Sequence, residues 1–354
     1  MTDPARLLDP LPQHVAVSYV MPVLNEAKHL ERAVTAILAQ EYAGEAEVVL
    51  ALGASTDDTD AIAERLAAAD PRVRLVHNPV NDIPKGVNAA IRASRHPVVI
   101  RVDAHAELPA GYTAAAVESL SRSGAANLGG MMVARGDNPV QSAIARAYNS
   151  PFGLGGGVYH HGDDEEPADS AYLGVFRREV LFEVGLFDET LRRAEDWELN
   201  SRIRAAGYLV LFVPKLKVTY WPRGSFAALR RQMYATGVWR GELVRRQRGT
   251  PVRYLPPPLV ALLVAGSVVF LLLQALGVVR GAGTWVAGAF HVGAVGYLVG
   301  AAAVGMTRLG GDTAYDRLLN AVALITMHLC WGAGFVRGIL GGAQRIVDRS
   351  RVTR

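Results

Sequence analysis

The sequence predicts an α/β protein, in which a Rossmann-like, mainly parallel sheet with flanking helices is followed by transmembrane helices. Two observations predict this class. Short apolar runs alternate with amphipathic stretches through residues 14–102, which is the pattern of buried parallel strands joined by helices. Beyond residue 254, three long apolar stretches contain no charged residue, and each approaches or exceeds the ~20 apolar residues that cross a bilayer.

The alternation places the elements in chain order. It is regular up to residue 102 and less regular afterwards. The carboxyl ends of parallel strands meet at one edge of a sheet, so the polar loops after the first, second and fourth strands are expected to lie together. Strands are expected at residues 15–20, 47–51, 72–76, 97–102, 127–134, 171–177, 208–213 and 216–220, and helices at residues 25–39, 55–69, 85–93, 138–148, 178–184 and 194–207.

Composition excludes several classes of protein. The net charge of +4 comes largely from arginines near and beyond residue 223. A basic zone beside apolar spans is typical of an anionic membrane surface, and no aromatic–basic interleaving supports nucleic-acid binding. The single cysteine, Cys330, excludes a disulfide within the chain. Residues 1–13 contain no apolar h-region, so no secretory signal peptide is expected and the globular part should stay in the cytosol.

The same patterns predict the domain organisation. Five arginines between residues 240 and 253 indicate that the side before the first span is cytosolic. Three spans would then leave the basic tail outside, so either one segment is re-entrant or interfacial, or the first span overrides the tail. We expect a disordered N-terminus at 1–13, an α/β domain at 14–224, an amphipathic interfacial helix and linker at 225–254, transmembrane segments at 256–279, 284–306 and 318–338 within a region 255–340, and a basic tail at 341–354.

The segment Asp103-Ala104-His105 is the strongest chemical signal in the chain. It follows the apolar run at residues 97–102. A carboxylate and an imidazole two residues apart at a strand end can hold one divalent cation, Mn²⁺ or Mg²⁺, which in turn can hold a diphosphate. Alone such a motif is more often a surface turn, and its value here comes from the polar loops at residues 22–26 and 52–57, which are expected at the same edge of the sheet.

Four segments in this order resemble the family 2 glycosyltransferases with the GT-A fold. The resemblance covers about residues 14–245. Together with the apolar tail, the Asp103-Ala104-His105 segment is most similar to bacterial exopolysaccharide enzymes of the succinoglycan glucosyltransferase type. The four segments are Val20-Met21-Pro22-Val23-Leu24-Asn25-Glu26, then Glu47-Val48-Val49-Leu50 with Ser55-Thr56-Asp57-Asp58-Thr59, then Val102-Asp103-Ala104-His105, and finally Glu195-Asp196-Trp197-Glu198.

The resemblance implies a donor site. In that site Asp103 and His105 are the expected ligands of the metal ion, which is Mn²⁺ or Mg²⁺. Leu52 stands where the family usually has an aspartate that contacts the nucleotide base, so base recognition has to use other groups; UDP is favoured. The simpler alternatives are a helix cap at Asn25 and Glu26 and a solvated surface lysine at Lys85. The residues expected to bind the nucleotide sugar are Pro22, Asn25, Glu26, Ser55, Asp57, Lys85, Asn88 and Asp103.

The resemblance also implies a base. Asp196 would remove the proton of the acceptor hydroxyl, with Glu195 beside it as the second residue assigned to catalysis. Like-charge repulsion from Glu195 and Glu198 is expected to raise the proton affinity of Asp196. The alternative is that these carboxylates only stabilise the start of a helix.

Two further segments carry predictions. The basic helix at residues 226–246 is expected on the membrane surface. Its residues match the Q-x-x-R-W element of processive members only loosely, and the spacing disfavours processive synthesis. Residues 152–169 are expected to form a lid or a solvated loop, in which His160, His161, Asp163 and Asp164 resemble a metal cluster. The residues assigned to the acceptor or lipid side, for which simple anchoring is the alternative, are Arg223, Gln232, Trp239 and Arg240.

The resemblance therefore implies an inverting hexosyltransferase anchored in the cell membrane with its catalytic domain in the cytoplasm. It would move a hexose, with UDP-glucose as the expected donor, to a lipid-linked saccharide in exopolysaccharide or cell-envelope glycan synthesis. One alternative is a polyprenyl-phosphate hexose synthase, whose acceptor is a lipid phosphate. The alternative of another class is a non-catalytic membrane scaffold with a nucleotide-binding fold, for which Leu52 is the main support.

Overall fold

The computed structural model describes residues 5–153, 162–247 and 252–343. The chain divides into two compact units. The first comprises Met1–Val133 and Val158–Tyr220, and the second comprises Ala134–Gly157 and Trp221–Arg354. The segment between β5 and residue 157 thus groups with the C-terminal helices. Each unit is described by itself.

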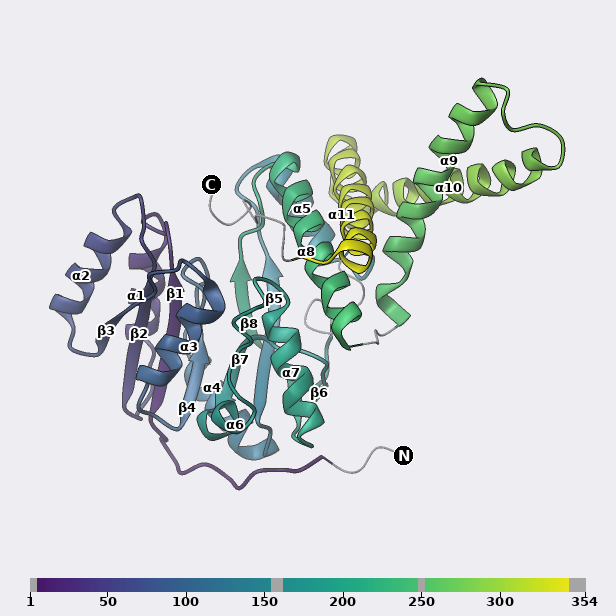
Figure 1. The fold of residues 1–354 in the computed structure, drawn as a ribbon. Helices are drawn as coiled ribbons and strands as arrows, with labels where there is room; N and C mark the ends of the chain where they lie inside the picture. The colour runs from purple at the N-terminus through teal and green to yellow at the C-terminus, as the bar shows by residue number, and fades with distance from the viewer. Residues whose placement is uncertain (1–4, 154–161, 248–251, 344–354) are drawn as a thin grey trace. The chain divides into compact units, whose positions relative to one another are not determined.

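The first unit is built on one eight-stranded mixed sheet in the order β3-β2-β1-β4-β7-β5-β8-β6 (Figure 1). The strands are β1 (Val17–Val23), β2 (Ala46–Leu52), β3 (Val73–His77), β4 (Val98–Arg101), β5 (Asn127–Ala134), β6 (Glu166–Pro167), β7 (Tyr172–Arg177) and β8 (Val210–Tyr220). The helices of this unit are α1 (Leu30–Leu38), α2 (Thr59–Ala69), α3 (Ile83–Ala93), α4 (Tyr112–Ser123), α6 (Arg178–Glu183) and α7 (Glu195–Ala205).

The parallel half of the sheet sets the position of the polar loops. Strand β1 pairs in parallel with β2 and β4, and β2 pairs in parallel with β3. The carboxyl ends of β1, β2 and β4 therefore lie at one edge, as the sequence predicts. Strand β7 runs antiparallel to β4 and β5, and these strands make the sheet mixed.

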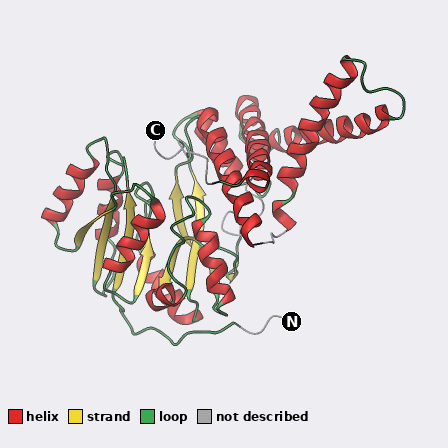
Figure 2. Ribbon diagram, in the orientation of Figure 1, coloured by secondary structure: helices red, strands yellow, loops and turns green. Residues whose placement is uncertain are grey.

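Helices lie on both faces of the sheet (Figure 2). Two apolar clusters lie between these helices and the sheet, one on each face. Side chains alternate between the faces along each strand, so Tyr19 and Met21 of β1 enter one cluster and Val20 enters the other. Helices α1 and α4 pack in the first cluster, and helices α3, α6 and α7 pack in the second. Both faces are thus covered, which explains why the strands read as continuous apolar runs.

The structure differs from the expected elements at several places. Helix α1 begins at Leu30 rather than at residue 25, because Asn25 takes a left-handed conformation (φ 53°) that a right-handed helix cannot continue. The two strands expected at 208–213 and 216–220 form the single strand β8. Helix α4 was not expected, although the glycines at both of its ends, Gly111 and Gly124, have positive φ and are a usable boundary signal.

The second unit is helical. It contains α5 (Pro139–Tyr148), α8 (Phe226–Gln247), α9 (Pro256–Ala275), α10 (Gly283–Gly305), α11 (Ala314–Gly341) and two short 3₁₀ turns, η2 (Val252–Tyr254) and η3 (Arg308–Gly310). Helices α9, α10 and α11 are long and apolar enough to cross a membrane. The prediction of three apolar C-terminal helices is confirmed, with different end residues.

Polar side chains join the first two of these helices. Ser267 Oγ of α9 lies 2.8 Å from Nδ1 of His291 in α10, and His291 Nε2 lies 3.1 Å from Gln274 Oε1. Both ring nitrogens thus have a partner on the neighbouring helix. Hydrogen bonds of this kind hold helices together where no water competes.

Helices α8 and α11 approach each other through a pair of glycines on each side. Gly237 and Gly241 are four residues apart on α8, and Gly334 and Gly338 are four residues apart on α11. A Cβ on Gly237 would lie 2.0 Å from the Trp331 carbonyl oxygen. The missing side chains let the two backbones touch, as in small-xxx-small packing. The predicted helix is confirmed, and one of its faces is occupied by α11.

We predict that Gly237→Ala lowers the free energy of unfolding of the second unit by about 1–3 kcal/mol, because the added methyl group overpacks a backbone contact. Gly300→Ala is the matched control, since a Cβ there meets nothing within 4 Å. Thermal unfolding of the purified full chain in detergent measures both variants. Equal melting temperatures for the two variants would refute the close α8–α11 contact.

Candidate active site

The loop after β1 and the turn before α2 are bonded to each other. Asn25 Oδ1 accepts a hydrogen bond from the Thr56 N–H at 2.7 Å, and the Asn25 N–H donates to Ser55 Oγ at 3.2 Å. The Glu26 N–H donates to Thr59 Oγ1 at 2.8 Å. The structure therefore brings two of the predicted motif segments together and explains the left-handed Asn25, whose side chain reaches across to the second segment.

Asp57 reinforces the same turn. Its carboxylate accepts hydrogen bonds from the Ala27 N–H and from the Thr59 N–H, at 3.3 and 3.1 Å. Burial raises the pKa of Asp57, but these bonds and one from the Thr59 hydroxyl outweigh burial and hold the pKa below its ordinary value. Asp57 is thus ionised and stabilises the conformation of the loop.

Glu26 reaches the third motif segment. Its Oε1 lies 3.3 Å from His105 Nδ1, and Glu26 is only 8% exposed. A carboxylate on one ring nitrogen fixes the orientation of an imidazole and leaves the other nitrogen for a metal. The contact of Glu26 with His105 was not expected, and its expected contact with the nucleoside stays a prediction.

Arg101 ends strand β4 and was not among the expected site residues. It is 5% exposed. Its Nη2 lies 3.3 Å from Asp103 Oδ1 and 3.5 Å from Glu195 Oε1, and its Nη1 hydrogen bonds to Asp196 Oδ1. Burial lowers the pKa of Arg101, but the charges of Asp196, Asp103 and Glu195 outweigh burial and raise it. One guanidinium thus joins the expected metal ligand to the expected base.

The expected base, Asp196, lies in the first turn of α7. Ala194, with φ 61°, makes the sharp entry into this helix. The side chain of Asp196 is 40% exposed, and that of Glu195 is 4% exposed. Glu198 pairs with Arg202 at 2.7 Å. Each of the two glutamates beside Asp196 thus has an arginine partner, and the expected rise in the proton affinity of Asp196 stays a prediction.

Two tyrosines near these charged groups, Tyr172 and Tyr220, were also not predicted from the sequence. The ring centroids of His105 and Tyr220 are 6.3 Å apart, and those of Tyr172 and Tyr220 are 6.4 Å apart. Among the described residues the buried Tyr172 hydroxyl has no hydrogen-bond partner. Burial, and after it the charge of Asp103, raises the pKa of Tyr172 well above its ordinary value. A neutral hydroxyl is thus held beside Asp103.

The donor set at Asp103 and His105 fits a divalent cation that shares its coordination with a substrate. Within residues 5–153, 162–247 and 252–343, no group of three or more His, Cys, Asp or Glu side chains could hold a metal. A carboxylate and an imidazole alone leave several positions open, which diphosphate oxygens can fill. Of the four residues at 160–164 that resemble a metal cluster, His160 and His161 lie outside the described residues.

Three other residues were expected to bind the nucleotide sugar, and the structure places them as follows. Asn88 is 1% exposed; its Nδ2 donates to the Phe187 carbonyl and to Glu189 Oε1, both at 2.9 Å, and its Oδ1 accepts from the Phe187 N–H. This amide holds the loop before α7. Pro22 pairs with Ala51 inside the sheet. Lys85 is exposed in the first turn of α3.

The residues assigned to the acceptor side all belong to the second unit. Arg240 and Trp239 are 5% and 3% exposed, and the Arg240 guanidinium lies 3.9 Å from the centroid of the Tyr254 ring. These two side chains are packed within the helical unit. Arg223 and Gln232 are partly buried. The acceptor or lipid-side roles of all four residues stay predictions.

The mixed, mainly parallel sheet with helices on both faces is a GT-A-like fold. The mannosyltransferase PcManGT from Pyrobaculum calidifontis, solved in complex with GDP-Man and Mn²⁺, has a similar fold, with a TM-score of 0.57 at 21% identity over 96% of this chain and 91% of that one.

Sequence comparison gives the family. The Glycosyl transferase family 2 model matches residues 18–185. The chain is 33% identical to the succinoglycan biosynthesis protein ExoA of Rhizobium meliloti (strain 1021), over 92% of this chain and 96% of ExoA. An uncharacterised glycosyltransferase of Mycobacterium tuberculosis (strain ATCC 25618 / H37Rv) is 30% identical over 59% of this chain and 86% of its own length. The chain belongs to Glycosyl transferase family 2.

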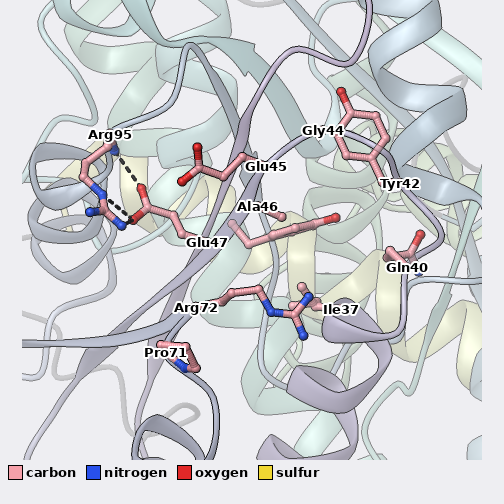
Figure 3. Close-up of a pocket in the computed structure, with 11 residues that line it drawn as sticks. Ile37, Gln40, Tyr42, Gly44, Glu45, Ala46, Glu47, Pro71, Arg72 and Arg95 are labelled. Carbon is pink, nitrogen blue, oxygen red and sulfur yellow. Dashed lines mark hydrogen bonds and ion pairs between the residues drawn. The ribbon is translucent and has the colours of Figure 1, made fainter.

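A cavity of about 340 Å³ lies at the other edge of the sheet, beside the start of β2 (Figure 3). Glu47 is its buried charge. It accepts hydrogen bonds from Ser18 Oγ and the Arg95 N–H at 2.7 Å and from Arg74 Nη1 at 2.9 Å. Burial raises the pKa of Glu47, but these bonds and the charge of Arg95 outweigh burial and lower it to about 2. The cavity wall is a stabilising ion-pair network.

We predict that Glu47→Gln destabilises the first unit by about 1–3 kcal/mol at pH 7, because the buried site loses charge-assisted hydrogen bonds. The pKa of about 2 is below the ordinary value of 4.5. The stabilisation by the carboxylate is therefore complete above pH 4.5 and disappears as the pH falls to about 2.

Denaturation of the full chain in detergent between pH 7 and pH 2 tests this pH dependence. The stability difference between the wild type and Glu47→Gln should shrink as the pH falls. The exposed pair of Glu31 and Arg65 supplies the control, and Glu31→Gln should change nothing measurable. A difference that stays constant down to pH 2 would contradict the assignment.

Proposed function

We propose that this chain is a membrane-anchored, inverting hexosyltransferase that moves a hexose from a nucleotide-diphosphate sugar, with UDP-glucose as the expected donor, to a hydroxyl of a lipid-linked saccharide. The observation that carries the proposal is the shared contact of Asp103 and Asp196 with Arg101. This contact puts a diphosphate-binding group and a proton acceptor within the span of one side chain.

The donor would lie along the carboxyl edge of β1, β2 and β4. The bonded loops that carry Asn25, Ser55 and Asp57 make one wall for the nucleotide. Asp103 and His105 would hold Mn²⁺ or Mg²⁺, and such an ion neutralises charge that develops on a departing diphosphate. The complex of PcManGT with GDP-Man and Mn²⁺ supports this class of donor and metal. Lys85 adds a cation in the first turn of α3.

The reaction would be a single displacement. The acceptor oxygen forms a bond to the anomeric carbon while the bond from that carbon to the diphosphate oxygen breaks, so the configuration inverts. The electron pair leaves with the nucleoside diphosphate. Asp196, partly exposed at the start of α7, takes the proton of the acceptor hydroxyl. The Tyr220 ring, which lies near the rings of His105 and Tyr172, would offer apolar surface on which the hexose ring can pack.

The helical second unit supports an acceptor that resides in the membrane. Its three candidate spans suggest membrane association, and a membrane-resident acceptor would reach the enzyme by lateral diffusion. The arginines before α9 favour a cytoplasmic catalytic unit. The similarity to ExoA, whose name refers to succinoglycan biosynthesis, supports a role in exopolysaccharide or cell-envelope glycan synthesis.

We predict that Asp196→Asn lowers kcat for transfer about 10²- to 10⁴-fold, which is the usual contribution of a general base. The assay measures radiolabelled hexose transfer by the purified full chain from UDP-, GDP- and dTDP-sugars, with and without Mn²⁺. Asp70→Asn is the control, because Asp70 ends α2 and pairs with Arg72.

Full transfer activity in Asp196→Asn would contradict the base assignment. Mild acid treatment of the lipid product that releases the label as free hexose would instead indicate a sugar phosphate, and would replace the saccharide acceptor by a polyprenyl phosphate. A hexose joined by a glycosidic bond stays attached to the saccharide after mild acid, and the label then appears in an oligosaccharide.

We also predict that Glu26→Gln raises the Mn²⁺ concentration for half-maximal activity about 10-fold, because a ligating histidine loses its carboxylate partner. The kcat at saturating Mn²⁺ should change little. The control is Glu31→Gln, since Glu31 is exposed on α1. An unchanged Mn²⁺ titration would return Glu26 to nucleoside contact alone.

A further inference from the structure

Arg101 is an unusual residue for its position. It is the last residue of β4, and its neighbours Ile100 and Val102 are fully buried. Its guanidinium carbon lies 5.6 Å from the centroid of the Phe187 ring. A buried cation is costly unless it is paired, so a chain that keeps an arginine here needs the partners that surround it.

Those partners come from two separate elements. Asp103 belongs to the loop that continues β4, whereas Glu195 and Asp196 belong to the first turn of α7. The two elements are more than 90 residues apart in the chain. Because Arg101 contacts both, it ties the loop with the expected metal ligand to the helix with the expected base.

We propose that Arg101 is a positioning residue for glycosyl transfer, which sets the separation of Asp103 and Asp196 before the donor and acceptor bind. This inference rests on the proposed function. Arginine suits the task because its planar group presents several donors in a fixed geometry and can hold two carboxylates at once. A lysine would keep the charge but would offer only a point-like ammonium group.

The charges of the cluster agree with this role. Without Arg101 the carboxylates of Asp103, Glu195 and Asp196 would repel one another and separate. With it, one positive charge faces three negative ones. The cluster stays negative enough to attract a divalent cation, yet its carboxylates stay together. The role therefore differs from that of a residue that binds the diphosphate directly.

A double-mutant cycle tests the proposal with the purified full chain, by steady-state transfer from the active nucleotide sugar in the presence of Mn²⁺. Arg101→Met should lower kcat about 10²-fold, the effect expected of a displacement of about 1 Å in a reacting group, while the donor KM changes less than about threefold. In the Asp196→Asn background the same substitution should lower kcat less than about threefold, because the positioned group is already gone. Arg101→Lys should recover part of the loss.

The matched control is Arg177, which is also 5% exposed but donates to the backbone carbonyls of Asp9 and Leu120. Arg177→Met and Arg177→Lys measure what a buried arginine contributes to folding alone. Melting temperatures place all variants on one scale. If Arg101→Met does not fold, Arg101→Lys carries the test against Arg177→Lys.

Two results would overturn the inference while the proposed function stands. In the first, the wild type transfers hexose but the Arg101 variants lose no more kcat than the Arg177 variants of equal stability. In the second, the effects of Arg101→Met and Asp196→Asn on kcat multiply. Absence of transfer by the wild type from every donor would instead overturn the proposed function, and the inference with it.

Discussion

The parallel pairing of β1 with both β2 and β4 is the constraint on which the site depends. The register that aligns Val20 with Arg101 and Val23 with Leu52 makes all three strands end at the same edge. The loops after them are then close enough for Asn25 to bond Thr56 and for Glu26 to meet His105. Residues up to 79 positions apart in sequence thus become neighbours because the sheet aligns the ends of their strands.

The α7 carboxylates are brought to this edge by a different interaction. Helix α7 packs through Leu199 and Ile203 on the face of the sheet that carries Val20 and Val99. The acidic first turn of α7 is not part of this apolar packing. Arg101 connects that turn to the sheet. The ion pairs are buried, so salt screens them less than it screens surface pairs, and the loss of one partner leaves uncompensated charge.

Much of this arrangement can be predicted from sequence because it depends on local patterns. The apolar runs predict the strands, the three apolar stretches predict α9 to α11, and the motif segments predict which loops meet. The start of α1 could not be predicted, since it depends on the left-handed Asn25, which bonds to a turn 31 residues away. The role of Arg101 could not be predicted either, because in the sequence it is only a single charge at the end of an apolar strand, and its partners on α7 are distant in the chain. The glycines of α8 likewise gain meaning only opposite those of α11.

The most direct test of the proposed chemistry is the position of a metal ion relative to the two carboxylates. Anomalous diffraction at the manganese edge, from crystals of the full chain with Mn²⁺ and the bound nucleotide diphosphate, measures it. We expect one manganese ion coordinated by Asp103 and His105 and by the diphosphate, with Asp196 facing the same cleft on the sugar side. Manganese bound elsewhere, or an Asp196 carboxylate that faces a separate cavity, would contradict this arrangement.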